Sequence, residues 1–372
     1  MEFMISFFNT LPNHMRGNPD AEHKVIMTDL EYMIAAEEAG FKYVIVPEHH
    51  FLDEYSHISG NAPVLGYLAH ATKRIHLLSG IMNPLPQIRH PATVAEACAY
   101  LDHISCGRFE FGSGRGAGSH EILAFFPEGT EINHTKEVWE DVISEIPKMW
   151  MQETYEGYSS KYWSLPPRKI VPKPYGKGHP PLWYAAGNTP SWENAGRKGM
   201  GLIGNSITNL ATAEKANEAY RKGIANAEPI GAFVNDYLSA VFHPFVSEDE
   251  GKAFDWVMSE EVAHQRSLLY RYHDTFPRPL GIPLWPELAP PTTRQEVLAM
   301  QQAGSLIGTP DQVIETLRKY AELGVNGVGF GVGMFGREHA LETIEVFGKY
   351  IIPALDTDPE FRTDGFRYGT TP

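Results

Sequence analysis

The chain has 372 residues, of which 42% are hydrophobic, and its formal net charge at pH 7 is −15. This length can bury one large α/β core or two smaller ones. The excess of negative charge disfavours nucleic acids and acidic membrane surfaces as partners, because both would repel the protein as a whole.

Segments of strand type and helix type alternate along the chain, which is typical of βα units on a parallel sheet. Apolar runs predict eight strands, at residues 3–8, 43–46, 75–79, 108–111, 182–185, 201–203, 234–242 and 327–330. Helices are expected at residues 22–39, 62–71, 92–104 and 134–151, from residues 189, 211 and 247 onward, and at 310–323 and 338–351. Eight strands, each followed by a helix, favour a single (β/α)8 TIM barrel domain over residues 1–372, with an open sheet as the alternative.

One stretch, at about residues 272–302, is too long for an ordinary connection and is rich in proline. We expect it to be an insertion or lid over the barrel mouth, with simple disorder as the alternative. Trp285, together with Leu284 and Phe276, would then cover the substrate with apolar surface and exclude water.

Cysteine content and the chain's first residues bear on its location. Cys98 and Cys106 are too few for a disulfide scaffold or a zinc site, and they suit a reducing compartment. The sequence opens without a basic leader and contains no run of 18 apolar residues. We therefore expect a cytoplasmic protein that is not inserted in a membrane.

Polar side chains that could take part in catalysis follow the second predicted strand, where the sequence reads YVIVPEHHF. A run that is buried on both faces suits a parallel strand, and sites in parallel α/β folds form at the carboxyl ends of strands. The imidazole of His49 can give or take a proton near neutral pH. Glu48 is expected to orient that ring, to contact the substrate or to cap the loop, and His50 fits a structural role.

Two further segments could bind a phosphate. In GSGRGAG, residues 112–118, glycines allow close approach of an anion and Arg115 offers a bidentate donor. In AAGNTPS, residues 185–191, polar groups precede a helix and could present free N–H groups. A tight turn and an ordinary helix cap are the structural alternatives. Both segments could serve one phosphate if the fourth and fifth strands are neighbours.

The first loop, FFNTLPNHMRG, supplies candidates for substrate recognition. Asn9, His14 and Arg16 are polar residues that would lie at the same end of the barrel as His49. A solvated surface loop is the alternative.

These motifs together resemble the bacterial luciferase-like flavin monooxygenases. The resemblance rests on EHHF, GNAP, LPQIRHP, LDHISCGRFEFGSGRG and GTPDQVIETLRKYAELGVNGVGFG, which follow in collinear order over nearly the whole chain. It implies a (β/α)8 barrel that holds FMN at the carboxyl ends of the strands. It also implies that the reduced flavin reacts with O2 to a C4a-peroxide, which oxygenates a small organic substrate.

The resemblance also implies roles for individual residues. His49 matches the catalytic histidine, and Arg115 matches the arginine that meets the FMN phosphate. Residues 80–83 match a bulged third strand that supports the flavin ring and contains a non-proline cis peptide, which we expect between Ile81 and Met82. The cofactor-binding residues carried over are Arg115, Gly187, Asn188, Thr189, Ser191, Ile81, Met82 and Asn83.

Two positions depart from the light-emitting members of that family. Gly114 stands where their catalytic subunit has a reactive cysteine, and Ala186 and Gly187 stand where they carry a Glu-Ser pair. The chain is therefore less similar to luciferase itself, and Asn188 and Thr189 would have to replace the lost hydroxyl.

Several alternatives and partners remain at this point. A branch of the family uses the deazaflavin F420 for hydride transfer, and a flavin-binding subunit without activity is a second possibility. A metal-dependent barrel hydrolase would need a His-x-His pair or a carboxylate at the end of a late strand, and the sequence shows no such arrangement. Because no NAD(P)H fingerprint is present, a separate flavin reductase should supply reduced FMN. The helices at 61–71 and 92–104 are expected to form a homodimer interface, with packing against the barrel as the alternative.

Overall fold

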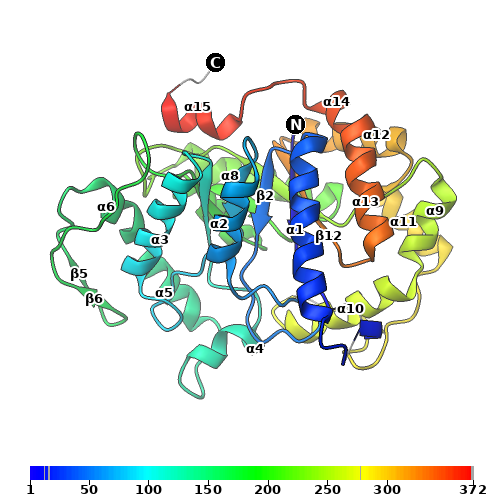
Figure 1. Ribbon diagram of the computed structural model, residues 1–372, viewed down its shortest axis with the longest axis horizontal. Helices are drawn as coiled ribbons and strands as arrows, with labels where there is room; N and C mark the ends of the chain where they lie inside the picture. The colour runs from blue at the N-terminus through cyan, green and yellow to red at the C-terminus, as the bar shows by residue number, and fades with distance from the viewer. Residues whose placement is uncertain (12, 16, 277, 370–372) are drawn as a thin grey trace.

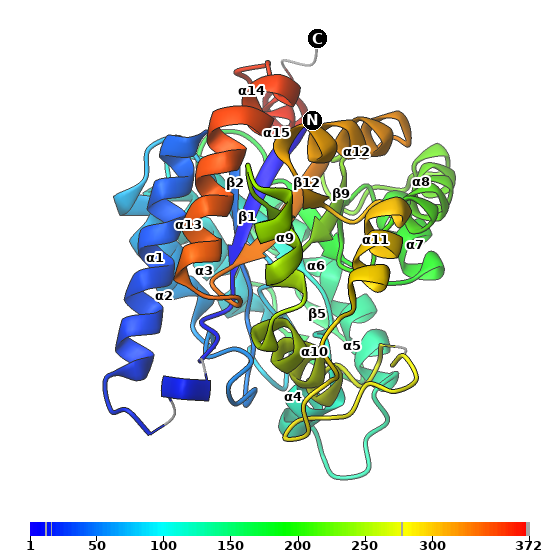
Figure 2. The same ribbon diagram turned by 90° about the vertical axis from the view of Figure 1, so that its right-hand side faces the viewer.

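The computed structural model describes residues 1–11, 13–15, 17–276 and 278–369. Eight parallel strands close into a barrel in the order β1-β12-β9-β8-β7-β4-β3-β2, and helices surround it (Figures 1 and 2). The barrel strands are β1 (Glu2–Phe7), β2 (Tyr43–Val46), β3 (His76–Ser79), β4 (Phe109–Ser113), β7 (Leu182–Ala185), β8 (Gly201–Gly204), β9 (Leu238–Phe242) and β12 (Gly327–Val332). The predicted TIM barrel is confirmed, including the pairing of the fourth and fifth barrel strands, β4 and β7.

The long helices pack around the barrel, and several of them begin or end within one residue of the predicted bounds. They are α1 (Ala21–Ala39), α2 (Asn61–Ala71), α3 (Pro91–Ile104), α5 (His134–Ile143), α6 (Glu145–Met151), α7 (Thr189–Arg197), α8 (Leu210–Ala225), α9 (Glu250–Val257), α10 (Glu260–Tyr272), α11 (Arg294–Ala303), α12 (Pro310–Glu322) and α13 (Arg337–Val346). The stretch predicted from residue 247 is instead two helices, the first of which begins at Glu250, and the helix at 294–303 was not predicted. The predicted helix 134–151 is interrupted at Ser144, because Pro147 has no N–H to donate to the preceding turn. The predicted closing helix is also divided, since α13 is followed by the π-helical turn η3 (Phe347–Ile351) and by α14 (Ile352–Leu355), which contains Pro353.

Short elements outside the barrel were not predicted. They are the 3-10 turns η1 (Asn13–Met15) and η2 (Leu123–Phe125), the helices α4 (Ser119–Ile122) and α15 (Arg362–Tyr368), the hairpin β5 (Tyr158–Ser159) with β6 (Ser164–Leu165), and the parallel pair β10 (Phe245–Val246) with β11 (Ile307–Gly308). The seventh barrel strand is shorter than expected, because β9 begins at Leu238 and not at residue 234. Residues 234–237 do not form a regular strand, and the backbone N–H of Asn235 donates to the Gly199 carbonyl.

The amino-terminal end of the barrel is closed by the C-terminal helix. In Figure 2, α14 and α15 lie at the end where the chain begins, and α4 and α10 lie at the opposite end. Arg367 of α15 forms a fully buried ion pair with Asp102 at 2.6 Å, and the Thr363 hydroxyl donates to Glu110 inside the barrel. Bulky side chains, including Tyr43, fill the interior between these ends. The carboxyl ends of the strands are therefore the end left for a site.

The predicted lid is partly helical. Residues 294–303 form α11, so the described irregular segment is residues 273–276 and 278–293. Its described part packs against α10, where the Trp285 N–H donates to the Ser267 carbonyl and Arg271 donates to the Trp285 carbonyl at 2.7 Å. Ala289 also donates its N–H to the Ser267 hydroxyl. These bonds favour an ordered cover over the alternative of disorder.

Within the described ranges, no helix combines the length and the apolar character that crossing a bilayer requires. This agrees with the absence of a long apolar run in the sequence.

A buried carboxyl group on α1 holds the loop after β1. Asp29 accepts hydrogen bonds from the backbone N–H and the side-chain amide of Asn9, both at 3.0 Å. Burial raises the Asp29 pKa to about 7, although the two hydrogen bonds oppose this shift. Between about pH 4 and pH 7, the Asp29 carboxyl group holds its proton in the folded state but has lost it in the unfolded state. The free energy of unfolding therefore falls as pH rises through this range.

This linkage gives a test with Asp29→Asn, whose amide oxygen can still accept from Asn9. We expect the unfolding free energy of the variant, relative to wild type, to rise by about 2 kcal/mol between pH 5 and pH 7. Urea unfolding at the two pH values measures it. A difference that is independent of pH would contradict the raised pKa.

Candidate active site

The side chain of His49 lies in the loop that follows β2 and is paired with a carboxylate. Its Nδ1 atom is 3.2 Å from Oε2 of Glu121, which α4 provides, and the two side chains are 11% and 2% exposed. The Phe8 ring stacks on the His49 ring at a centroid distance of 5.9 Å, and the backbone N–H of His49 donates to the Ile58 carbonyl. The carboxylate fixes the Nδ1 side of the ring, so Nε2 is the nitrogen left for proton transfer.

Glu48 and His50 are paired with each other and not with His49. Oε1 of Glu48 is 3.1 Å from Nε2 of His50, and Oε2 lies 3.4 Å from the Asn83 backbone nitrogen and 3.5 Å from Arg89. The Glu48 side chain is only 1% exposed. Glu48 therefore does not orient the His49 ring; it ties the loop after β2 to the segment after β3. Its contact with the substrate stays a prediction, and the placement favours a supporting role for both residues.

The segment after β3 contains the expected cis peptide, one residue earlier than predicted. The cis bond joins Gly80 to Ile81, not Ile81 to Met82. Gly80 is required here because a Cβ atom at this position would lie 2.2 Å from Cγ2 of Ile45. The three predicted flavin-supporting residues, Ile81, Met82 and Asn83, are all buried beside this bond. The side-chain amide of Asn61 donates to the Ile81 carbonyl at 2.8 Å and holds the segment in place.

Arg115 follows β4 and carries a buried guanidinium nitrogen, Nη1, that has no hydrogen-bond partner within the protein. Such groups are uncommon in folded proteins and indicate that a ligand atom completes the site. Burial lowers the Arg115 pKa. Lys136 of α5 is a second cation near Arg115. Burial, and to a smaller extent the positive charge of Arg115, lower the Lys136 pKa. Two neighbouring cations suit an anion such as phosphate.

The amino end of α7 lies beside this loop. β4 pairs with β7 in parallel, with Ser113 opposite Tyr184, so residues 112–118 and 185–191 emerge together. Asn188 is the helix cap, and its side chain accepts from the Ser191 N–H at 3.2 Å. Pro190 has no N–H, and the Ser191 N–H already donates to Asn188. The backbone N–H of Thr189 is therefore the one at this terminus that could donate to an anion. The Ser206 hydroxyl donates to the Gly187 carbonyl and fixes the turn.

The predicted substrate contacts have different positions. His14 is exposed in η1, and Arg16 lies outside the described residues. Trp285 is half-buried and belongs to an apolar cluster that also contains Phe8 and Tyr55, both of which contact His49. The structure thus brings Trp285, but not His14, into the surroundings of His49.

Sequence reasoning missed three residues of this arrangement: Glu121, Lys136 and His273. Glu121 and Lys136 lie on elements that follow the GSGRGAG loop, and no local spacing distinguishes either of them. His273 has no local signal, because it reaches His49 only through the fold, with ring centroids 6.1 Å apart.

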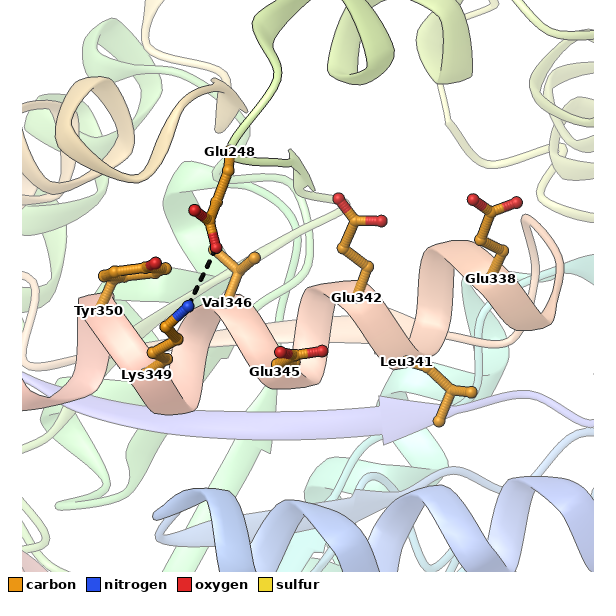
Figure 3. A pocket seen from close by; sticks show the side chains of 8 residues that line it. All are labelled: Glu248, Glu338, Leu341, Glu342, Glu345, Val346, Lys349 and Tyr350. Atoms are coloured by element: carbon orange, nitrogen blue, oxygen red, sulfur yellow. Dashed lines mark hydrogen bonds and ion pairs between the residues drawn. The ribbon is translucent and has the colours of Figure 1, made fainter.

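A separate groove lies along α13 (Figure 3). Its volume is about 330 Å³, and it is lined by Glu248, Glu338, Leu341, Glu342, Glu345, Val346, Lys349 and Tyr350. Lys349 already pairs with Glu248 at 3.2 Å. The groove contains no histidine, so we place the candidate active site at the strand ends. Across the described residues, no group of three or more His, Cys, Asp or Glu side chains is arranged to hold a metal ion.

Comparison with known proteins agrees with this geometry. Residues 1–327 match the sequence model of a family described as luciferase-like monooxygenase. The chain belongs to this family. The matched range includes the segments at residues 80–83, 112–118 and 185–191.

The names of relatives of this chain indicate two kinds of cofactor. An F420-dependent glucose-6-phosphate dehydrogenase of Segniliparus rotundus is 25% identical over 88% of this chain and 93% of its own length. The oxygenase component of a flavin-dependent trigonelline monooxygenase of Acinetobacter baylyi is 24% identical over 92% of this chain and 94% of its own. A solved structure with FMN, the oxygenating constituent of 3,6-diketocamphane monooxygenase from Pseudomonas putida, has a TM-score of 0.71 at 17% identity, covering 95% of this chain and 98% of that chain.

Proposed function

We propose that the protein is an FMN-dependent monooxygenase that oxygenates a small organic substrate with O2 and reduced FMN from a separate flavin reductase. One observation carries this proposal: the His49–Glu121 pair and the unpartnered guanidinium nitrogen of Arg115 lie at the same end of the barrel. The trigonelline and diketocamphane enzymes are named as an oxygenase component and an oxygenating constituent, which supports a two-component system.

The residues present fit a flavin phosphate. Arg115, Lys136 and the Thr189 amide would hold it, and Ile81 and its neighbours would support the ring. When bound, reduced flavin supplies the electrons that activate O2. The protein's own part is to exclude water and to move a proton. Glu121 holds Nδ1 of His49, and Nε2 gives or accepts the proton on the substrate side.

F420-dependent hydride transfer is the second candidate, favoured by the relative from Segniliparus rotundus. Titration of the purified chain with FMN and with F420, followed by flavin fluorescence, distinguishes the two. We expect tight binding of FMN and weak binding of F420. Tighter binding of F420, with substrate oxidation that needs no O2, would contradict the monooxygenase proposal.

Dependence on a reductase gives a direct prediction. The purified chain with FMN, NADH and O2 should oxidise substrate slowly, because no dinucleotide-binding segment is present in its sequence. Adding a flavin reductase should restore turnover, as measured by product formation. Brisk oxidation without the reductase would contradict the two-component proposal. Both partners would meet in the cytoplasm, where we place the protein.

A homodimer is proposed through α2 and α3, which pack side by side (Figure 1). Three large apolar side chains on these helices are exposed: Tyr67 by 46%, Tyr100 by 63% and Ile104 by 45%. A second copy would cover them. Tyr100→Glu should therefore shift the mass measured by light scattering from dimer to monomer, while Leu341→Glu on α13 should leave it unchanged. A wild-type monomer, or a dimer retained by Tyr100→Glu, would overturn this interface.

A further inference from the structure

His273, the first residue after α10, is a buried imidazole without partners. His273 is 6% exposed, and neither its Nδ1 nor its Nε2 atom has a hydrogen-bond partner. Buried polar side chains nearly always have at least one such partner, and leaving one unpaired costs about 1–3 kcal/mol. No residue of the described chain meets this requirement, so the missing partner is expected to be a ligand.

The segment around His273 is hydrogen-bonded to Ala117 and Ser119, at the end of the GSGRGAG loop, and these bonds hold the ring in place. Asp274 accepts from the backbone N–H of Ser119 at 2.9 Å and also from its hydroxyl, and the Thr275 hydroxyl donates to the Ala117 carbonyl. A Cβ atom at Gly118 would lie 1.9 Å from the Tyr272 carbonyl oxygen, so the two backbones are in close contact. His273 therefore belongs to the same rigid arrangement as the loop of Arg115.

The ring of His273 lies edge-on to that of His49, with centroids 6.1 Å apart and planes at 77°. One oxygen or nitrogen atom with two hydrogen bonds of about 2.8 Å could join the two imidazoles across such a separation. Tyr55 and Phe276 flank His273, each at a centroid distance of 5.1 Å, and supply aromatic surface.

The charge state of His273 restricts the ligand further. Burial, and then the His49 charge, lower its pKa to about 3, so the ring is neutral at physiological pH. A neutral imidazole has one N–H donor and one acceptor nitrogen. Among aromatic rings, a charged group would lose its hydration, and any positive charge on His49 is already paired with the carboxylate of Glu121.

We propose that His273 determines substrate specificity by hydrogen-bonding, together with His49, an uncharged polar atom on a planar, largely apolar substrate. This inference rests on the proposed function, because it assigns the substrate to the site of His49. It predicts discrimination against two kinds of analogue: molecules that lack the polar atom, and molecules that carry a full charge in its place.

Three small probes of matched shape test this inference: acetophenone, ethylbenzene and benzoate. Each is titrated into the full chain, loaded with FMN and without it, and the histidine nitrogens are followed by NMR after labelling with nitrogen-15. The His273 signals are assigned from their loss in His273→Asn. We expect acetophenone to bind about tenfold more tightly than ethylbenzene and benzoate and to shift the His273 signals, which corresponds to one net hydrogen bond.

Variants separate this role from a structural one. His273→Phe should abolish the preference for acetophenone, and His273→Asn, which keeps a donor and an acceptor, should retain part of it. His339→Phe is the matched control, because His339 is also buried among aromatic rings but lies on α13. It should leave the preference unchanged.

Equal affinity of the wild type for the three probes, or no binding of any, would overturn the inference, as would a preference that survives His273→Phe. Failure of the proposed function is a different outcome. It would appear as absent binding of FMN, while the probe titration of the chain without FMN still reports on His273.

Discussion

His49→Gln should slow substrate oxygenation by about 100-fold to 10,000-fold, the range expected for loss of a general acid or base. The glutamine side chain is uncharged and cannot exchange a proton near neutral pH, but it can still fill the space beside Phe8. Binding of FMN should be unchanged, because the phosphate contacts lie on other strands. The rate is measured in single turnovers of the chain loaded with reduced FMN, using a substrate found by screening.

Two further variants sharpen this test. Glu121→Gln should lower the rate less than His49→Gln, since it removes the group that orients the imidazole but leaves the imidazole itself. His103→Gln, an exposed position on α3, is the control and should have no effect. An unchanged rate in His49→Gln would contradict the assignment. It would favour the alternative in which the chain binds flavin without catalysing a reaction.

Arg115→Met should weaken FMN binding by about 10-fold to 100-fold, because a charge-assisted hydrogen bond to a buried donor contributes about 1.5–3 kcal/mol. Methionine keeps much of the apolar stem and removes the charge. The measurement is a fluorescence titration of the oxidised flavin. Riboflavin, which lacks the phosphate, provides the internal comparison: its affinity should be the same for wild type and variant.

Arg318→Met, on the exposed side of α12, controls for the loss of one positive charge and should leave the affinity for FMN unchanged. If Arg115→Met weakened the binding of FMN and riboflavin equally, the phosphate assignment would be wrong. The loop would then support the flavin ring or the fold. Lys136→Met should weaken FMN binding in the same way but by less, as measured in the same titration.

The barrel could be predicted from the sequence because its signals are local. A continuous apolar run such as residues 43–46 defines a buried strand, and β2 has those bounds. The short pieces α4 and α15 carry no comparable period over their four and seven residues, so pattern alone does not identify them. Pro147 is a local signal for the interruption between α5 and α6, because proline has no N–H to donate within a helix.

The site could be predicted only in part, because half of it depends on contacts distant in sequence. His49 and Arg115 lie in motifs at strand ends, and the barrel brings these motifs together at one end. Which carboxylate pairs with His49 could not be read from spacing: the adjacent Glu48 was the natural candidate, but Glu121 makes the contact from 72 residues away. His273 is further removed and reaches the site through the packing of α10 and the segment after it.

In the proposed reaction, O2 and reduced FMN together oxygenate a substrate at the barrel mouth. The most direct measurement is a single turnover of the chain loaded with reduced FMN in isotope-labelled O2, with the product analysed by mass spectrometry. We expect one labelled oxygen atom to enter the product for each reduced FMN consumed, and we expect this incorporation to be lost in His49→Gln. Substrate oxidation without label in the product, or oxidation that proceeds with F420 in the absence of O2, would contradict it.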